Sequence, residues 1–369
     1  MLAAYISGHG FGHTVRTGQV LRAVRARRPG LALTIVTSTD ETVCRRAAGD
    51  PVTVRPTRLD VGVVQGDALT LDERATADAW EALHRDYDAR VASEARWLRE
   101  SGAALVLADI PPIAFDAAAE AGLPSVGLSN FSWDWIYRHL ARREPRLAHA
   151  AADAARAYAR ADLLLELPFA GDLSAFPRRE RIPLVARRST HTRAAARRSI
   201  GLEGGWPVVL ITFGGIGIPG FDLGALSALP EFIFLATEGE ASAANVRRIA
   251  VAALAQAGLD YVDLVAAADV VVTKPGYGIV SDAIACRTRI VFTDRGDFPE
   301  YPILVEGMAR FLPAAHVSNE DLRAGRLGEA LRQVLAMPFP GPPDLGGAEA
   351  AADRLLALVD GRASAPRRG

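Results

Sequence analysis

Short apolar runs alternate with amphipathic or alanine-rich segments along nearly the whole chain. This alternation is typical of parallel β-sheets covered by helices, because each crossover between parallel strands needs room for a helix. The strand candidates are residues 2–7, 32–38, 104–109, 125–130, 163–167, 207–213, 231–237, 269–274 and 289–294. The helix candidates are residues 14–27, 40–48, 72–100, 113–121, 132–140, 146–160, 221–228, 275–286, 300–309 and 319–335. The expected fold class is therefore α/β, with two doubly wound, Rossmann-like sheets.

An arginine-rich stretch that is poor in core residues, 176–205, separates the two series of strands. A chain of 369 residues is long enough for two domains, so we place the boundary near residue 180. The Pro- and Gly-rich segment 337–347 then separates a last amphipathic helix from the second domain. The expected parts are a first domain at 1–180, a second at 181–340, and at 341–369 a C-terminal helix and tail that could pack back on the first domain.

The charge balance, with 42 Lys and Arg against 43 Asp and Glu, gives no reason to expect nucleic acid or an anionic membrane as a partner. The sequence has no apolar run of about 18 residues, and its N-terminus leads directly into a strand candidate. Cys44 and Cys286 have no Cys or His nearby at metal-ligand spacing, so no zinc site is expected. We therefore expect a cytoplasmic protein without a transmembrane segment, and leave peripheral membrane contact open.

A glycine-rich stretch, SGHGFGHT, follows the first strand candidate. Gly10 and Gly12 would let the backbone approach a ligand closely, and a helix beginning near Thr14 would offer its free N–H groups to an anion. His13 at the start of this helix is a candidate general base, since a neutral imidazole can take a proton from a hydroxyl group. His9 could contact the acceptor, or it could only fill space.

Two further strand candidates end in polar or aromatic residues. Asp109 could hold His13 in the required tautomer, as in other His-Asp pairs, or it could cap the following helix. Asn130, Trp133 and Asp134 follow the next strand candidate and could bind a sugar or a lipid-like acceptor by stacking and hydrogen bonding. The alternative is that the tryptophans of this stretch belong to the core.

The second half contains the stronger phosphate-binding pattern. Lys274, the only lysine of the chain, ends a strand candidate and enters a loop with Gly276 and Gly278. Lysine and helix N–H groups could neutralise a diphosphate, and Ser281 with Asp282 in the following helix could bind ribose hydroxyls. Asp282 could instead only stabilise the helix dipole.

Two more loops of the second half complete the set of candidates. The first follows the strand candidate PVVLITF and contains Thr212, Gly214 and Gly215, whose amides could bind phosphate. The second is TDRGDFPEY, in which Arg295 and Glu300 could contact the sugar or the phosphates.

Four motifs occur in an order that resembles the two-Rossmann-domain glycosyltransferases called GT-B. They are GHGFGHTVR, TFGG, ADVVVTKPGYGIVSDAI and FTDRGDFPEY. Within this fold the chain is similar to the group of the lipid I N-acetylglucosaminyltransferase and the diacylglycerol sugar transferases. It resembles most the glycosyltransferase-like N-terminal region of plant L-arabinokinase, in GHGFGHTVR, SNFSWDWIY and GYGIVSDAIA.

The resemblance implies two Rossmann-like domains that face a cleft, with the acceptor on 1–180 and the nucleotide sugar on 181–340. His13 matches the family's catalytic histidine, and Gly214 with Gly215 matches the loop near the donor diphosphate. Ser281 and Asp282 match a Ser-Glu pair whose acidic member binds the ribose.

The leading hypothesis is an inverting glycosyltransferase that uses a nucleotide-diphosphate sugar, with a UDP-sugar as the expected donor, and an unidentified acceptor, with no metal or other cofactor. His13, assisted by Asp109, would deprotonate the acceptor hydroxyl. Two alternatives stay open, a nucleotide-sugar 2-epimerase and a non-catalytic module that binds a nucleotide sugar and regulates.

Overall fold

The protein is described here by a computed structural model, which describes residues 1–66, 70–202, 204–214, 220–237, 239 and 243–363. Contacts divide the chain into two compact units. Unit 1 comprises Met1–Val64, Asp72–Ala186 and Asp344–Gly369, and unit 2 comprises Gln65–Leu71 and Arg187–Pro343.

Unit 1 is built on a seven-stranded parallel sheet with the order β3-β2-β1-β4-β5-β6-β7. Its strands are β1 (Leu2–Ile6), β2 (Leu33–Thr37), β3 (Thr53–Pro56), β4 (Leu105–Asp109), β5 (Ser125–Ser129), β6 (Leu163–Glu166) and β7 (Arg179–Arg181). The strand order reverses between β1 and β4, where Ile6 pairs with Asp109. In open parallel sheets, this switch point is where a ligand binds, beyond the carboxyl ends of the strands.

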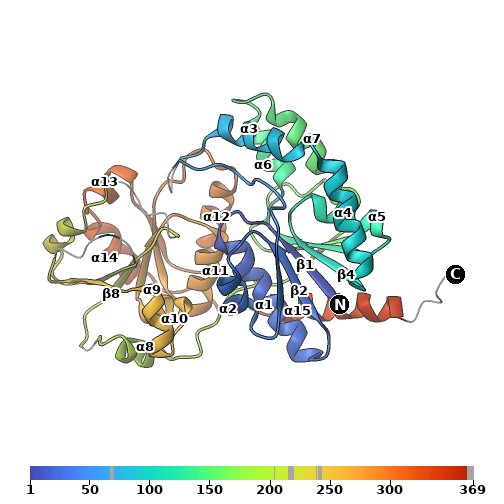
Figure 1. Ribbon diagram of the computed structural model, residues 1–369. Helices are drawn as coiled ribbons and strands as arrows, with labels where there is room; N and C mark the ends of the chain where they lie inside the picture. The colour runs from blue at the N-terminus through green and yellow to red at the C-terminus, as the bar shows by residue number, and fades with distance from the viewer. Residues whose placement is uncertain (67–69, 203, 215–219, 238, 240–242, 364–369) are drawn as a thin grey trace. The chain divides into compact units, whose positions relative to one another are not determined.

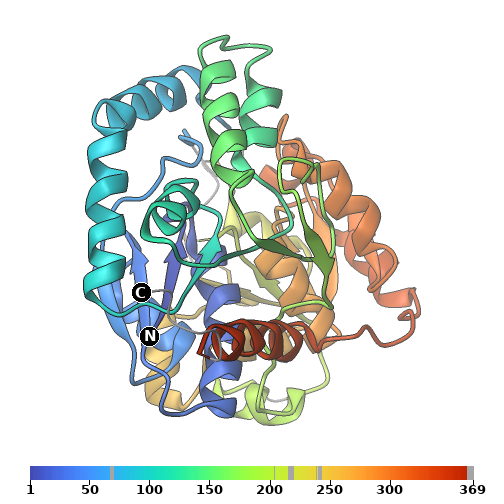
Figure 2. The same ribbon diagram turned by 90° about the vertical axis from the view of Figure 1, so that its right-hand side faces the viewer.

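Helices cover both faces of the sheet of unit 1, with α1, α2 and α15 on one face and α4 and α5 on the other (Figure 1). The helices of unit 1 are α1 (Phe11–Arg27), α2 (Glu41–Ala48), α3 (Glu73–His84), α4 (Tyr87–Glu100), α5 (Ile113–Ala121), α6 (Trp133–Leu140), α7 (Leu147–Tyr158) and α15 (Gly347–Ala363). The C-terminal helix α15 packs against α1, which it crosses in Figure 2, and Arg28 Nη2 lies 2.7 Å from both carboxylate oxygens of Asp360. The last helix of the chain therefore completes one face of unit 1.

Unit 2 contains a six-stranded parallel sheet with the order β10-β9-β8-β11-β12-β13. Its strands are β8 (Val208–Ile211), β9 (Ile233–Ala236), β10 (Val246–Arg248), β11 (Val270–Thr273), β12 (Arg289–Phe292) and β13 (Ala314–His316). Its helices are α8 (Arg193–Ser199), η1 (Leu223–Ala228), α9 (Val251–Leu254), η2 (Ala255–Ala257), α10 (Tyr261–Ala267), α11 (Tyr277–Cys286), α12 (Glu300–Met308), α13 (Asn319–Arg323) and α14 (Gly328–Ala336). The switch point of this sheet lies between β8 and β11.

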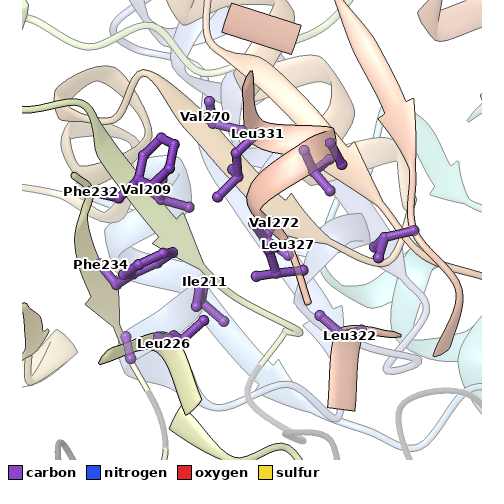
Figure 3. Packing of buried hydrophobic residues seen from close by; sticks show 14 of the residues in the cluster. Val209, Ile211, Leu226, Phe232, Phe234, Val270, Val272, Leu322, Leu327 and Leu331 are labelled. Carbon is purple, nitrogen blue, oxygen red and sulfur yellow. The ribbon is translucent and has the colours of Figure 1, made fainter. Parts of the chain in front are cut away.

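A hydrophobic core fills one face of the sheet of unit 2 (Figure 3). Val209 and Ile211 of β8 and Val270 and Val272 of β11 point alternate side chains to this face, because successive residues of a strand face opposite sides. Leu331 of α14 and neighbouring residues cover them. The packed core fixes the strand ends from which the candidate site loops leave.

The sequence prediction missed four strands, β3, β7, β10 and β13. All four lie at sheet edges. An edge strand is paired on one side only and is often short and polar, so it does not give a conspicuous apolar run. β7, whose residues Arg179–Arg181 are all exposed, is the clearest case.

Several predicted helices differ in their bounds. The helix predicted at 72–100 is split into α3 and α4, because Asp86 leaves the helical conformation with φ −123° and ψ 29°. The helix predicted at 319–335 is likewise split into α13 and α14, with Gly325 at φ +68° between them. The segment predicted as a helix at 221–228 is the short 3-10 helix η1.

Candidate functional site

The first candidate site lies where β1 and β4 end, at the switch point of unit 1. Helix α1 begins at Phe11, three residues earlier than predicted, with Gly10 at φ +77° before it. Gly12 and His13 therefore belong to the first helical turn and not to a loop. Nothing lies within 4 Å of the place that a Cβ atom would occupy at Gly10 or Gly12. A ligand could therefore approach the backbone closely at these two glycines.

The structure brings His13 and Asp109 together. His13 Nδ1 lies 2.7 Å from Asp109 Oδ1, and the two residues are 6% and 0% exposed. Asp109 does not cap the next helix, because α5 begins after Pro112 and has no side-chain cap. Of the two roles that the sequence left open for Asp109, the structure therefore shows the pairing with His13 and not the helix cap.

Two residues that sequence reasoning missed also bind Asp109. Arg16 donates from Nε to Oδ2 over 2.7 Å and from Nη2 to Oδ1 over 2.5 Å, and the Thr17 hydroxyl donates to Oδ2 over 2.7 Å. Burial alone would raise the pKa of Asp109, but the electrostatic interactions and hydrogen bonds with Arg16 and His13 outweigh it and lower the pKa well below its usual range. Arg16 follows His13 by three residues, and this helical spacing on one face is the signal that could have found it.

The proton on His13 has a defined position in this arrangement. Asp109 is ionised, so Nδ1 carries the hydrogen and donates it to Asp109. Nε2 is then the nitrogen that can accept a proton, and no side chain or backbone group of the described residues hydrogen-bonds to it. The pair can therefore act as an oriented general base.

The candidate acceptor contacts Asn130, Trp133 and Asp134 are interior residues, and Trp133 has the core position that the sequence left open as the alternative. Asn130 is 0% exposed and accepts a hydrogen bond of 2.7 Å from Arg16 Nη1. Trp133 is also fully buried, with its ring stacked on Tyr137. The 1% exposed Asp134 accepts from Arg138 Nη2 over 2.6 Å, and burial raises its pKa. The stretch begins an amphipathic helix, α6, whose apolar face turns inward.

A second carboxyl group near His13 was also missed. Asp60 accepts a hydrogen bond of 3.0 Å from Trp133 Nε1. Burial raises the pKa of Asp60, although Ser7, His13, Trp133 and the backbone of Gly8 act in the opposite direction. The segment that contains Asp60 also contacts His9. His9 Nδ1 accepts a hydrogen bond from the Val63 backbone N–H over 3.4 Å, and its ring meets the Trp133 ring edge-on. His9 is thus half-buried against the loop at 60–63.

The second group of candidates follows β11 and β12 of unit 2. Lys274 is half-buried at the end of β11, and Gly276 precedes α11 without a side-chain cap. Gly278 lies in the first turn of α11, not in a loop as predicted. Arg295, which follows β12, donates from Nη1 to the Pro275 carbonyl over 3.1 Å and to Glu300 over 2.9 Å. The structure therefore joins the loops after β11 and β12, each of which the sequence had singled out separately.

Ser281 and Asp282 have interior partners. Ser281 is 2% exposed and donates to the Gly278 carbonyl over 2.9 Å. Asp282 is 1% exposed and accepts from the backbone N–H and Nε of Arg187 over 3.2 and 3.0 Å, with Nη2 as a further donor. Its carboxylate faces Arg187, so this geometry does not present it to ribose hydroxyls as expected. The reason is that the early turns of α11 bury this face.

The loop after β8 is described only in part. Thr212 is 4% exposed and its hydroxyl is hydrogen-bonded to that of Tyr261. Gly214 has φ +78°, a conformation that favours glycine, whereas Gly215 lies outside the described residues. The Arg187 guanidinium lies 5.4 Å from the centre of the Tyr261 ring, so Thr212, Tyr261, Arg187 and Asp282 form one connected group in unit 2.

Two kinds of feature are absent from the described part of the chain. No helix there is long and apolar enough to cross a membrane. Within the same residues, no group of three or more His, Cys, Asp and Glu side chains could hold a metal ion.

No protein-family model matches the chain. The Arabidopsis thaliana L-arabinokinase is 30% identical over 368 residues, which are 98% of this chain and 35% of that protein. The chain thus spans about a third of the length of this relative.

Solved glycosyltransferases share the architecture of the chain. The Phytolacca americana UGT2 complexed with UDP-2-fluoro-glucose and pterostilbene superposes with a TM-score of 0.62 at 11% identity, over 97% of this chain and 94% of that chain. The Acinetobacter baumannii MurG gives a TM-score of 0.56 at 13% identity, over 96% and 99% of the two chains. With its two parallel sheets, the chain has the two-Rossmann-domain fold of the GT-B glycosyltransferases, as its motifs predicted.

Proposed function

We propose that the protein is an inverting glycosyltransferase that moves a sugar from a nucleotide-diphosphate sugar to an acceptor hydroxyl. The observation that carries this proposal is the buried pair of His13 and Asp109, 2.7 Å apart at the switch point of unit 1. A histidine oriented by a carboxylate can activate a hydroxyl at neutral pH. The fold, which glycosyltransferases share, supports the same reaction class.

In the proposed reaction, Nε2 of His13 takes the proton of the acceptor hydroxyl. The acceptor oxygen forms a bond with the anomeric carbon of the sugar from the face opposite the nucleotide, and the bond to the diphosphate oxygen breaks. Asp109 stays ionised and stabilises the imidazolium that forms, while Arg16 and Thr17 hold Asp109 in place. The nucleoside diphosphate leaves with the electron pair of the broken bond.

The donor side of the proposal rests on unit 2. Lys274 and the backbone N–H groups at the start of α11 would neutralise the charge of the leaving diphosphate, with no metal ion or other cofactor in this scheme. We propose a UDP-sugar as the donor, since UGT2, which has a similar fold, is complexed with UDP-2-fluoro-glucose. We also propose a cytoplasmic location, which agrees with Cys44 and Cys286 being free thiols.

The test measures nucleoside diphosphate release from a panel of nucleotide sugars with a broad set of acceptors. His13→Ala should lower the rate by about 10²–10⁴-fold, the usual contribution of general base catalysis. His149→Ala, a change at an exposed histidine of α7, is the matched control and should retain the wild-type rate. Equal rates for wild type and His13→Ala would remove His13 from the mechanism.

The same panel separates the two alternatives. An epimerase would interconvert two nucleotide sugars in the absence of any acceptor, which product analysis by chromatography detects. A binding module would show calorimetric binding of a nucleotide sugar without release of nucleoside diphosphate. Transfer of the sugar to an acceptor with inverted anomeric configuration would support the proposed function against both.

A further inference from the structure

A cavity of about 590 Å³ lies in unit 2 near the amino ends of β11 and β12, whereas the Lys274 loop follows the carboxyl end of β11. Its wall includes Ala266 and Cys286, which lie at the ends of α10 and α11 just before β11 and β12 begin. Lys274 follows β11, at the carboxyl end of the strands. The cavity and the candidate donor site therefore lie at opposite ends of the same strands.

The wall of this cavity is cationic. The arginines Arg188, Arg193 and Arg287 line it together with His191, and none of the described residues that line it is Asp or Glu. Burial lowers the pKa of Arg193, and the nearby charges of Arg197 and Arg289 lower it further against the opposing effect of Asp269. A bound anion would relieve this crowding of like charges.

The acceptors that hold Arg193 neutralise only part of its charge. Arg193 donates from Nε to the Ala266 carbonyl over 2.9 Å and from Nη2 to the Arg287 carbonyl over 3.1 Å. Its carboxylate partner, Asp269, lies 3.4 Å away and is shared with Arg197, which is closer at 2.6 Å. A helix C-terminus carries only about half a negative charge, so the helix ends offset the guanidinium groups in part.

Arg287 has an unusual backbone for an arginine. It caps α11 with φ 50° and ψ 52°, the left-handed conformation that favours glycine. Its guanidinium lies over the Phe339 ring at 4.6 Å and is within 3.4–3.5 Å of the Pro340 carbonyl. A strained backbone conformation of this kind persists only where the surrounding structure enforces it, and such conformations cluster at functional sites. Here the Arg287 side chain supplies a positive charge to the cavity wall.

The opposite part of the wall is held in place by a buried carboxylate. Asp263 is 3% exposed, accepts from the Ser189 hydroxyl over 2.5 Å and lies 3.4 Å from His191 Nδ1. Asp263 also forms the capping box of α10 with Asp260. The side chains of Ser189 and His191 are thus positioned before any ligand arrives, which lowers the entropic cost of binding.

We propose that this cavity binds a small organic phosphate. Its phosphate oxygens would accept hydrogen bonds from Arg188, Arg193 and Arg287, since a guanidinium fork matches the geometry of a phosphate group. Phe339, together with Ala266 and Ala285, gives the cavity an apolar side for the rest of the molecule. The site is additional to the proposed transfer reaction and does not depend on it.

The experiment measures the affinity for inorganic pyrophosphate and for glucose 1-phosphate by calorimetry at constant ionic strength. Lys274→Ala serves as the background, so that the candidate donor site contributes less to binding. Arg287→Gly removes the cation at a position where glycine suits the backbone, so the variant should fold, which its melting temperature checks. Arg310→Ala, at an exposed arginine of the same unit that pairs with Glu306, is the matched control.

We expect Arg287→Gly to weaken binding of both phosphates by about tenfold or more, because a charge-assisted hydrogen bond is lost, and Arg310→Ala to leave the affinity unchanged. If Arg287→Gly does not fold, Arg188→Met provides the same comparison at an exposed residue of the wall. Equal affinities in the wall variant and the control would overturn the proposal, as would binding that Lys274→Ala alone abolishes. The readout is binding, so it stands whether or not sugar transfer is found.

Discussion

The buried guanidinium of Arg16 gives the sharpest prediction about unit 1. Arg16→Met removes the charge but keeps an apolar side chain of similar length. Arg16 is 4% exposed and donates to both carboxylate oxygens of Asp109, to Asn130 Oδ1 over 2.7 Å and to Ser129 Oγ over 3.1 Å. The substitution therefore leaves a fully buried carboxylate whose side-chain partners, among the described residues, are only His13 and Thr17.

The expected cost follows from this burial. Removing one partner of a buried ion pair lowers the free energy of unfolding by about 3–5 kcal/mol, because the remaining charge is no longer compensated. The pKa of Asp109 is lowered in the folded protein, so its ionised form stabilises the fold above the unfolded pKa of about 3.9. This stabilisation is lost as the pH falls through the folded pKa. The difference between wild type and Arg16→Met should thus be constant near neutral pH and narrow below about pH 4.

Urea denaturation followed by tryptophan fluorescence measures the effect. Of the five tryptophans, Trp80, Trp97, Trp133 and Trp135 belong to unit 1, and only Trp206 belongs to unit 2. The signal therefore reports mainly on unit 1. Arg156→Met, at an exposed arginine of α7 that pairs with Asp153, is the control and should leave the midpoint nearly unchanged.

A small effect would refute this reasoning. A loss below about 1 kcal/mol would mean that the pair contributes no more than an exposed one. The double variant Arg16→Met/Asp109→Asn gives a second check, since removing the charge of Asp109 should recover part of the loss. Two losses that simply add would show that the two side chains do not interact energetically.

Two further predictions concern Asp60 and the position of α15. The pKa of Asp60 is raised by burial, so its ionised form destabilises the fold at neutral pH. Asp60→Asn, which can still accept a hydrogen bond from Trp133 Nε1, should therefore raise the urea midpoint at pH 7. This gain in stability should disappear below about pH 4, where the carboxyl group is protonated in the unfolded chain as well. A lower midpoint at pH 7 would contradict this. Gly347 packs so closely that an added Cβ would lie 2.1 Å from the Pro183 carbonyl, so Gly347→Ala should displace the start of α15 and cost about 1–3 kcal/mol in urea denaturation. Gly341→Ala, where nothing lies within 4 Å, is its control, and equal stability of the two variants would rule out the close packing.

Much of the fold could be predicted from the sequence, because buried parallel strands give continuous apolar runs. β4 and β11 are examples, with all their residues buried. The ends of these runs also located Asp109 and Lys274 at strand ends, where ligands of such sheets bind. The edge strands gave no such signal, since β7 has only exposed charged residues.

The partners of the site residues depended on the tertiary structure. Asp109 meets His13, which lies 96 residues earlier in the chain, because β4 pairs with β1, the strand before α1, and strand order cannot be read from local periodicity. Arg187 and Asp282 lie 95 residues apart, so their pairing was equally hidden. Trp133 lies on the buried face of α6, and which face of that helix is buried is decided by the segments packed against it. The sequence alone determined which residues lie at strand ends, since that depends on local patterns, whereas packing between distant segments decided which charges are paired and which side chains are buried.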